Sequence, residues 1–442
     1  MTLRRKRRHL APPMSALLIC LVGVSYAHAD VTFNVNTTAD LLDQDTGDGV
    51  CLTASGQCSL RAAIMQANHL IGPIATHIRL PAGNYMLTRV ASGSNGEDSG
   101  DLNFTAPLSA GQMTFIDGAA PATTLIDANQ SGRVLKISAG RSVVVNRVTI
   151  RGGFVSNDSG GGIRNEGSVQ LVDSVVEGNV CDHLGGGILS FGTLDVRRST
   201  LRNNTGIGGG AIFATIATVR ESSLYGNLSR SDGGAIYLAG SYSTDYLVVV
   251  NSTISANAAN RNGGGIVSVG AVSIYNSSII NNDADHDRDE LGGIGGGVWV
   301  DPQARFIAVN SLIAANTVND APIPDDCNGT LEVYGRNLMG TLDGCTFTGN
   351  GTAARGLIST NTIGPLQDNG GPTWTHALLA GSEAIDATTA QGCVDDTLAT
   401  LATDQRGAAR IAGLRCDVGA YEYGATPPVS DWIFATGFEV VP

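Results

Sequence analysis

A phrase that recurs six times between residues 139 and 320 constrains the fold of this chain more than any other feature. Each copy has a Gly-Gly step followed by Ile or Val, a short alternating segment, and then Ser-x-hydrophobic-x-x-Asn. The Gly steps begin at Gly161, Gly186, Gly209, Gly233, Gly264 and Gly296. The Ser and Asn pairs are Ser174/Asn179, Ser199/Asn204, Ser222/Asn227, Ser252/Asn257, Ser277/Asn282 and Ser311/Asn316. Copies lie 25, 23, 30, 25 and 34 residues apart, so a unit of about 24 residues recurs, twice with a longer loop.

The alternation within a unit predicts short strands with one apolar face. In the second copy one side carries Leu194, Val196, Ser199 and Leu201. The other side carries Asp195, Arg197, Arg198 and Arg202, with a corner at 197–198. One such face has nothing to pack against within its own unit. Stacking the units in parallel, roughly 4.8 Å apart, pairs each strand with the next and joins the apolar faces into one core. We therefore expect an all-β chain folded as a right-handed parallel β-helix.

The recurring Gly, Ser and Asn residues have a structural explanation in such a stack. Gly adopts positive φ and leaves room where neighbouring coils approach closely. Asn at a fixed corner tolerates the left-handed conformation, and stacked Asn side chains hydrogen-bond along the axis as a ladder. A residue type that returns in every coil is part of the architecture, whereas a functional site occurs once.

The start of the chain has the pattern of a secretory signal peptide at residues 1–29. Five basic residues from Arg4 to Arg8 precede an apolar run from Met14 to Val24, and Ala27-His28-Ala29 fits a cleavage site. The apolar run is too short to span a membrane, so we expect no transmembrane span in the mature chain. The full chain carries a charge of −13, and this segment holds five basic and no acidic residues, so the remainder carries −18. Such acidity argues against nucleic acid as a partner.

Seven cysteines remain, and export allows them to oxidise. Three pairs are local in sequence and lie outside the regular coils, so we expect them to form disulfides: Cys51 with Cys58, Cys327 with Cys345, and Cys393 with Cys416. Cys181 is left over. It is interpreted as a small core or loop residue, with a reactive thiol or a link to a partner as the alternative.

Residues 30–75 are expected to cap the first coil. Ser59 can cap a short helix that runs to Asn68, and a helix across the end of the stack would cover its open sheet edge. The stretch Cys58-Ser59-Leu60-Arg61-Ala62-Ala63-Ile64 resembles the CSLREA domain, an N-terminal element of exported bacterial β-helix proteins. The usual glutamate of that family is Ala62 here.

The array itself is assigned to residues 76–320, and its Gly-Gly-Ala/Gly-Ile repeats resemble those of polymorphic outer-membrane proteins and pectate-lyase-like β-helices. Residues 321–423 leave the repeat. Their characteristic segments are Gly364 to Leu378, Ala384-Ile385-Asp386-Ala387, Asp404-Gln405-Arg406-Gly407 and Cys416 to Tyr423. In this order they resemble the choice-of-anchor Q domain, which implies a secreted or cell-surface location and no catalytic residue. His376, Asp404 and Arg406 are accordingly interpreted as structural residues of a disulfide-tied C-terminal cap domain, and 424–442 is a short tail.

One insertion is a candidate calcium loop. It places carboxylates at alternate positions: Asp283, Asp285, Asp287 and Asp289. Arg288 stands where such a loop has Gly, and Ile294 where it has Glu, so a solvated charged loop is the competing interpretation. Asp43, Asp45 and Asp48 form a second candidate of the same kind. Beyond calcium, no cofactor is expected.

The function classes follow from what the repeat displays. The outward turn positions of successive coils are Asp173, Arg198, Glu221, Asn251, Asn276 and Asn310, which form no row of carboxylates. Asp325 and Asp326 fall in an expected loop away from the array. We therefore expect a monomeric, non-enzymatic, adhesin-like protein of the cell envelope that binds a glycan, a surface or a protein, with 227–252 and 282–311 as variable recognition loops. The alternative is a polysaccharide lyase or glycoside hydrolase acting on an acidic polymer, and a third hypothesis is an envelope filler without a ligand.

Overall fold

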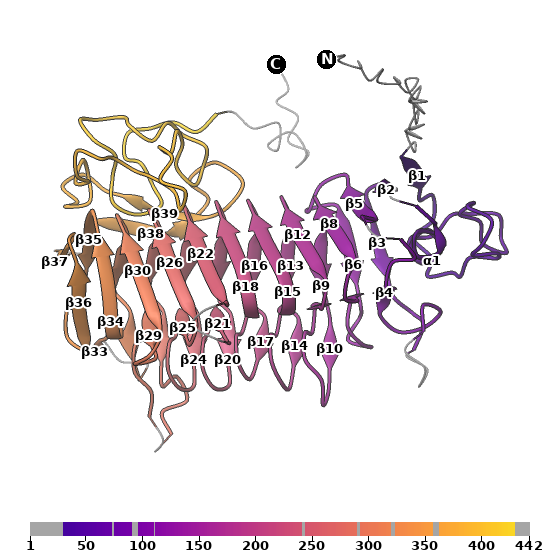
Figure 1. The fold of residues 1–442 in the computed structure, drawn as a ribbon, viewed down its shortest axis with the longest axis horizontal. Helices are drawn as coiled ribbons and strands as arrows, with labels where there is room; N and C mark the ends of the chain where they lie inside the picture. Colours follow the sequence, from indigo (N-terminus) through magenta and orange to yellow (C-terminus); the bar gives the residue numbers. More distant parts are fainter. Residues whose placement is uncertain are drawn as a thin grey trace, which may run out of the picture.

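The computed structural model describes residues 30–72, 75–90, 96–109, 111–240, 244–289, 292–319, 323–356 and 362–428. The predicted signal peptide and the tail beyond residue 428 lie outside these residues. Within them the chain forms a right-handed parallel β-helix with one α-helix at its N-terminal end, as Figure 1 shows. The predicted fold class is confirmed.

Three sheets run along the stack through the described residues. Sheet I contains β1 (Val31–Asn34), β2 (Ala75–Leu80), β4 (Leu102–Phe104), β5 (Met113–Gly118), β7 (Leu135–Ile137), β8 (Ser142–Asn146), β11 (Ile163–Asn165), β12 (Ser168–Val172), β15 (Ile188–Arg197), β18 (Ile212–Arg220), β21 (Ile236–Leu238), β22 (Tyr246–Val250), β25 (Ile266–Ser268), β26 (Ala271–Tyr275), β29 (Val298–Val300), β30 (Arg305–Val309), β34 (Cys327–Tyr334) and β36 (Cys345–Gly349). Sheet II contains β3 (Gly83–Met86), β6 (Thr124–Asp127), β9 (Thr149–Arg151), β13 (Val175–Glu177), β16 (Thr200–Arg202), β19 (Ser223–Tyr225), β23 (Thr253–Ser255), β27 (Ser278–Ile280), β31 (Leu312–Ala314), β35 (Arg336–Met339) and β37 (Thr352–Arg355). Sheet III contains β10 (Phe154–Val155), β14 (Val180–Cys181), β17 (Thr205–Gly206), β20 (Leu228–Ser229), β24 (Ala258–Ala259), β28 (Asp283–Ala284), β32 (Thr317–Val318) and β33 (Ile323–Pro324).

The register between coils follows the repeat of the sequence. Val169 pairs with Leu194 in sheet I, Val176 with Leu201 in sheet II, and β14 with β17 in sheet III. Equivalent residues of successive copies therefore lie directly above one another. Their inward side chains form one continuous apolar core along the axis, in which Val196 and Leu201 are fully buried.

The recurring Asn residues form a buried ladder. Each side-chain amide donates to the Oδ1 of the next Asn along the axis, with Nδ2–Oδ1 distances of 2.8 to 3.0 Å. The same Oδ1 atoms accept the backbone N–H of the Asn one coil earlier. The Ser residues form a parallel ladder in which the backbone N–H of one Ser donates to the hydroxyl of the next. Both ladders satisfy polar groups that the stack removes from water.

The left-handed conformation is not at the ladder Asn, where the repeat pattern predicts it, but at the residue before it. That position has positive φ and holds Gly178, Asn203, Gly226, Ala256, Asn281 and Ala315. The ladder Asn must point its side chain inward to bond along the axis, so the preceding residue makes the turn.

The Asn ladder ends at a carboxylate. Asp326 Oδ1 accepts from the Nδ2 of Asn316 at 2.8 Å and from its backbone N–H at 3.0 Å, and Oδ2 accepts from the backbone N–H of Thr341. Asp326 is fully buried, which raises its pKa to about 6. Its assignment to a loop away from the array was therefore wrong, because the ladder needs an acceptor at its last rung.

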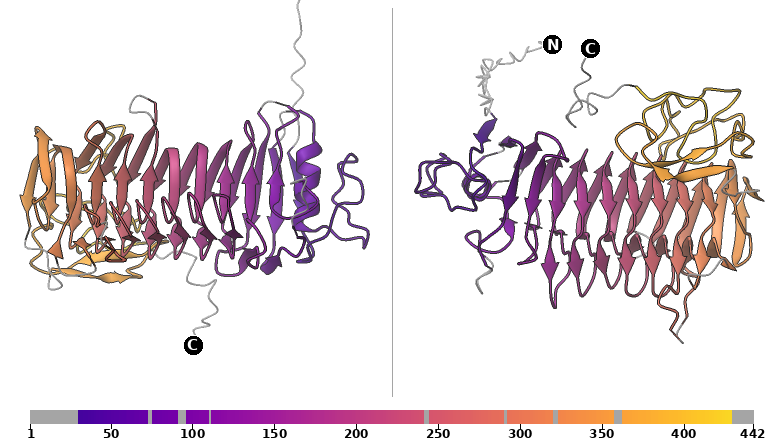
Figure 2. Two further views of the ribbon diagram at one scale, coloured as in Figure 1. Left: turned by 90° about the horizontal axis from the view of Figure 1, so that it is seen from below. Right: turned by 180° about the vertical axis from the view of Figure 1, so that it is seen from behind.

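The N-terminal helix α1 (Leu60–His69) packs against β2 and β4 and lies across the end of the stack, as Figure 2 shows. Ser59 caps it, since its hydroxyl oxygen accepts from the backbone N–H of Ala62. Disulfides join the three predicted cysteine pairs, with Cα–Cα distances of 5.1, 5.6 and 6.1 Å in chain order. Cys181 is buried in β14, and this burial raises the pKa of its thiol.

The stack continues past residue 320. β34 and β36 extend sheet I, and β35 and β37 extend sheet II to Arg355, although these coils lack the Gly phrase. Residues 362–428 then turn back along the flank of the last coils, over the side where sheets I and II meet (Figures 1 and 2). They contain the antiparallel pair β38 (Ile363–Gln367) and β39 (Thr375–Leu378) and the disulfide of Cys393.

Removing one rung of the Asn ladder should destabilise the whole stack. Asn227→Ala leaves a buried backbone N–H and a carbonyl without their partners, which we expect to lower the free energy of unfolding by about 1–3 kcal/mol. Denaturant unfolding followed by far-UV circular dichroism measures this difference. Asn350→Ala, at an exposed position, is the control and should leave the midpoint unchanged.

Asp326 should make stability depend on pH. Its folded pKa, about 6, lies above the ordinary value of 3.8, so its contribution is fully present below pH 4 and is lost as pH rises through 6. The unmodified protein should lose about 3 kcal/mol of unfolding free energy between pH 4 and pH 7.5 through this group. Asp326→Asn cannot titrate here, so this part of the loss should be absent in the variant. Urea unfolding at both pH values gives the comparison, with the exposed Asp343→Asn as control. Equal pH dependence in Asp326→Asn and the unmodified protein would contradict this assignment.

Candidate functional site

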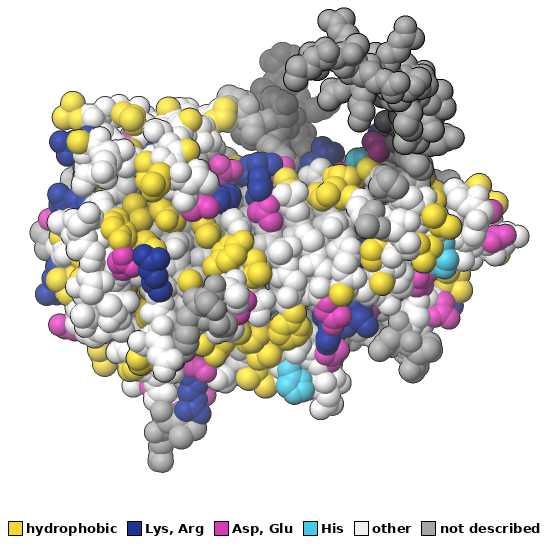
Figure 3. All heavy atoms as spheres, in the orientation of Figure 1, with side chains coloured by type: hydrophobic (Ala, Val, Ile, Leu, Met, Phe, Trp, Pro, Cys, Tyr) yellow, Lys and Arg dark blue, Asp and Glu magenta, His cyan; other side chains and the backbone are white. Residues whose placement is uncertain are grey.

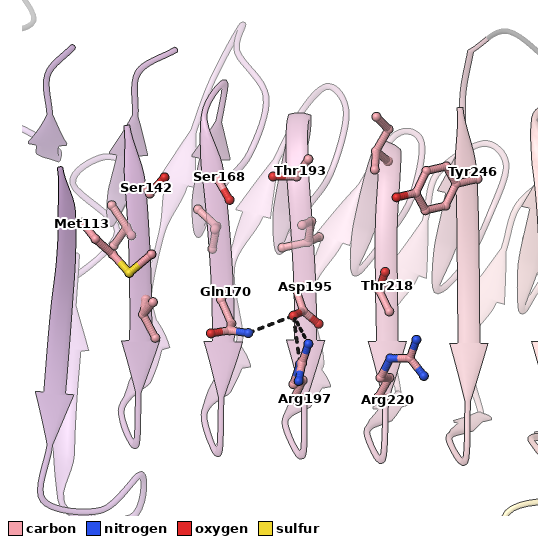
Figure 4. A pocket seen from close by; sticks show the side chains of 15 residues that line it. Met113, Ser142, Ser168, Gln170, Thr193, Asp195, Arg197, Thr218, Arg220 and Tyr246 are labelled. Atoms are coloured by element: carbon pink, nitrogen blue, oxygen red, sulfur yellow. Dashed lines mark hydrogen bonds and ion pairs between the residues drawn. The ribbon is translucent and has the colours of Figure 1, made fainter. Parts of the chain in front are cut away.

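The outer face of sheet I carries a groove along the stack axis. A cavity of about 350 Å³ runs across the strands from β5 to β22 (Figure 4). Its lining side chains alternate with buried ones, because successive residues of a strand point to opposite faces. The polar and aromatic lining residues are Ser142, Ser168, Gln170, Thr193, Asp195, Arg197, Thr218, Arg220 and Tyr246.

The stacking register turns these side chains into rows. Ser142, Ser168 and Thr193 are direct partners on β8, β12 and β15, so three hydroxyl groups follow one another along the axis. The same register position holds Ile216 on β18 and Tyr246 on β22. The groove therefore presents repeated hydroxyls with an aromatic ring at one end.

One carboxylate lies in the groove, and it is paired. Asp195 Oδ2 accepts from Nε2 of Gln170 and from Nε of Arg197, both at 2.8 Å. The hydrogen bond from Arg197 to Asp195 raises the pKa of that guanidinium. Arg220 points toward the same end of the strands and donates to Asp396 of the C-terminal segment at 2.7 Å. Both arginines of the groove therefore have a carboxylate partner, Asp195 within the groove and Asp396 outside it.

The outward turn positions are all left-handed, and they divide into two groups. In the first, Arg198 pairs with Asp173 at 2.7 Å and with Glu221 at 3.9 Å, so these residues form ion pairs between coils. In the second, three asparagines donate side-chain hydrogen bonds to backbone carbonyls of the C-terminal segment: Asn251 to Thr403, Asn276 to Val394 and Asn310 to Gly392. On these three coils the side chain of the turn residue itself binds that segment.

His376, Asp404 and Arg406 are buried and make contacts within the C-terminal segment and with the stack. His376 hydrogen-bonds with Ser255 through Nε2 and with the Gly364 carbonyl through Nδ1, each at 2.8 Å, and burial lowers its pKa. Asp404 and Arg406 form a buried pair at 2.7 Å, and the guanidinium lies 3.6 Å from the ring centroid of Tyr421. These contacts hold the C-terminal segment together and against the stack.

The predicted calcium loop follows β28. Ligand atoms of Asp285, Asp287 and Asp289 lie within 4.8 Å of one another. Asp283 is directed elsewhere, since it interacts with His286 and accepts from the hydroxyl of Thr317. Burial, followed by the charges of Asp287, Asp289 and Asp283, raises the pKa of Asp285. The structure therefore brings together three of the four predicted residues.

In the second Asp-rich loop, that of Asp43, Asp45 and Asp48, a side-chain amide lies between the carboxylates. Nε2 of the buried Gln66 lies 2.9 Å from Oδ1 of Asp43 and 3.1 Å from Oδ1 of Asp48, and it also contacts the carbonyls of Asp45 and Val50. Both carboxylates accept backbone N–H groups as well. This loop is explained by hydrogen bonds within the N-terminal cap.

Sequence reasoning missed the groove residues Gln170, Thr218 and Tyr246, because each is an ordinary outward residue within its own strand. The signal that would have found them is the register between copies, which places outward residues of five coils side by side. Phe213 and Tyr237 are also partners in the register of β18 and β21, and their rings stack with centroids 5.1 Å apart.

No family model matches the chain, and no curated protein matches it. Among solved structures, a crystal structure of pectate lyase Pel9A is similar, with 14% sequence identity, a TM-score of 0.47, and coverage of 89% of this chain and 96% of that chain. A likeness at this level carries no argument about activity. The resemblances to the CSLREA and choice-of-anchor Q domains therefore rest on sequence segments alone, Cys58 to Ile64 for the first and Gly364 to Tyr423 for the second.

Gln405 should control the docking of the C-terminal segment. Its buried amide accepts from the hydroxyl of Thr253 at 2.6 Å and donates to the carbonyl of Ser222 at 3.2 Å. Gln405→Ala should lower the local opening free energy of this segment by about 1–3 kcal/mol. In Gln405→Ala, backbone amide hydrogen exchange should then become faster over 362–428 and stay unchanged at Val196 in the stack. The exposed Gln391→Ala is the control, and equal exchange in both variants would count against the assignment.

Proposed function

We propose that this protein is an exported, non-enzymatic β-helix of the cell surface or the medium that binds a glycan along the groove on sheet I. The observation that carries the proposal is the hydroxyl row of Ser142, Ser168 and Thr193 with Tyr246 at its end. Repeated hydroxyls can exchange hydrogen bonds with a polymer of sugars, and a tyrosine ring offers an apolar face together with a polar tip.

The charge pattern favours binding over cleavage. A glycoside hydrolase uses two carboxyl groups about 5–9.5 Å apart, and a lyase uses a base beside a calcium-bound acid. Among the described lining residues, Asp195 is the sole carboxylate, and Arg197 and Gln170 hold it. Neither the second carboxyl group of a hydrolase nor a calcium-binding set of acids stands beside Asp195 among these residues. A polysaccharide lyase or hydrolase therefore stands as the alternative that the experiment must exclude.

The proposed location rests on several independent features. The pattern of residues 1–29 is that of a secretory signal, and three disulfides are typical of an oxidising compartment. The resemblances to the CSLREA and choice-of-anchor Q domains add support for the surface. In the described part of the chain, no helix is long and apolar enough to cross a membrane.

A binding assay tests the proposal. The mature chain should be retained on immobilised polysaccharides from a panel of neutral and uronate-containing polymers, and Tyr246→Ala should weaken binding to the retained polymer roughly tenfold, about 1.4 kcal/mol. Tyr423→Ala, a partly exposed tyrosine in the C-terminal segment, is the matched control and should bind normally.

The same panel tests the enzymatic alternative. Each polymer is incubated with the protein in the presence and absence of calcium, and reducing ends and unsaturated products are measured. We expect no products. Product formation that is lost in Asp195→Asn, or in Asp283→Ala or Asp285→Ala, would replace the binding proposal with a lyase or hydrolase.

A further inference from the structure

Residues 285–289, which follow β28, project below the stack in Figure 1, and the exposed Asp287, Arg288 and Asp289 come after the buried Asp285. Its first turn is still held to the preceding coil, because the backbone N–H of Asp285 donates to the carbonyl of Arg261 and that of His286 to Ala259. Figure 3 shows charged side chains gathered on this lower projection. Asp287 and Asp289 are exposed and stand beyond these anchored residues.

The spacing of the three carboxylates suits one cation. Their ligand atoms lie within 4.8 Å of one another. Oxygens that share one calcium ion are bound at about 2.3–2.6 Å, so three ligand atoms this close can reach a common ion. Calcium suits a flexible set of carboxylates and waters, whereas magnesium demands near-ideal octahedral geometry and gives up its water reluctantly.

Asp285 supplies a second and independent observation. Its side chain is only 7% exposed, and its Oδ1 has no hydrogen-bond partner among the described residues. A buried carboxylate oxygen without a donor is costly, and proteins normally satisfy such a group with a donor or a metal. The Asp43 loop shows the contrast, because there the amide of Gln66 satisfies the carboxylates.

We propose that Asp285, Asp287 and Asp289 bind one calcium ion, with water completing the coordination. The guanidinium of Arg261 lies 3.8 Å from Asp289 and competes with calcium for this carboxylate. We therefore expect the affinity for calcium to be moderate. Extracellular calcium modules of this class have dissociation constants of about 10⁻⁴–10⁻³ M. Binding would join the projecting residues Asp287 and Asp289 to the anchored Asp285 and so fix the loop against the stack. This inference does not depend on the glycan groove.

The test is a calcium titration of the full mature chain by isothermal calorimetry, after removal of metal with a chelator. We expect one ion per chain and at least tenfold weaker binding of magnesium. Asp287→Asn and Asp289→Asn, which alter exposed side chains, should each weaken calcium binding roughly tenfold, because affinity follows the number of charged ligands. Asp343→Asn removes an exposed carboxylate elsewhere and should bind as the unmodified protein does.

Calcium at 5 mM should also raise the thermal midpoint relative to chelator, and this rise should vanish in the double variant Asp287→Asn/Asp289→Asn. Circular dichroism verifies that the variants are folded. Absence of saturable binding, or binding that is the same in Asp287→Asn, Asp289→Asn and Asp343→Asn, would overturn the proposal. Equal affinity for magnesium would overturn the choice of metal.

Discussion

Each coil of this protein satisfies its backbone and buries its aliphatic side chains only through the coils on either side of it. A strand of three to five residues has too few apolar groups to form a core alone. In the stack, Val176 lies above Leu201 and Leu201 above Leu224, and all three are removed from water. The Asn and Ser ladders likewise satisfy buried polar groups at the corners through the neighbouring coil. The same register therefore sets both the packing and the hydrogen bonding.

This constraint leaves function to the outward residues and to departures from the repeat. Inward positions, including the ladder Asn and Ser residues, must be alike from coil to coil, while outward positions are free to differ. The groove arises where hydroxyls, Gln170 and Tyr246 meet on one face. The C-terminal segment is bound by the side chains of the turn residues Asn251, Asn276 and Asn310. Aliphatic residues on the outer face beside this segment, Ile307 and Val309 among them, line a cavity with it.

The two Asp-rich loops have similar sequences, but the residues around them give their carboxylates different partners. Both space carboxylates as calcium loops do. In the N-terminal cap the helix brings Gln66 into the centre of the loop, where its amide donates to the carboxylates. After β28 the backbone N–H of Asp285 donates to the carbonyl of Arg261 in the preceding coil, and Oδ1 of Asp285 has no hydrogen-bond partner among the described residues. The same local pattern is a closed hydrogen-bond network in one place and a candidate ion site in the other.

The sequence by itself determined the stacked architecture, the inward residues, the cap of α1 and the pairing of cysteines, because each depends on spacing along the chain. Leu194 and Val196 could be assigned to the core from alternation alone. Only the tertiary structure decided that Asp326 ends the Asn ladder, that the turn is made before each ladder Asn, and that residues 362–428 lie along the flank. It also decided which outward residues form the groove. Each of these features joins residues from different coils or from the C-terminal segment. The residues become neighbours only in the folded chain, so the sequence of one repeat does not contain the information.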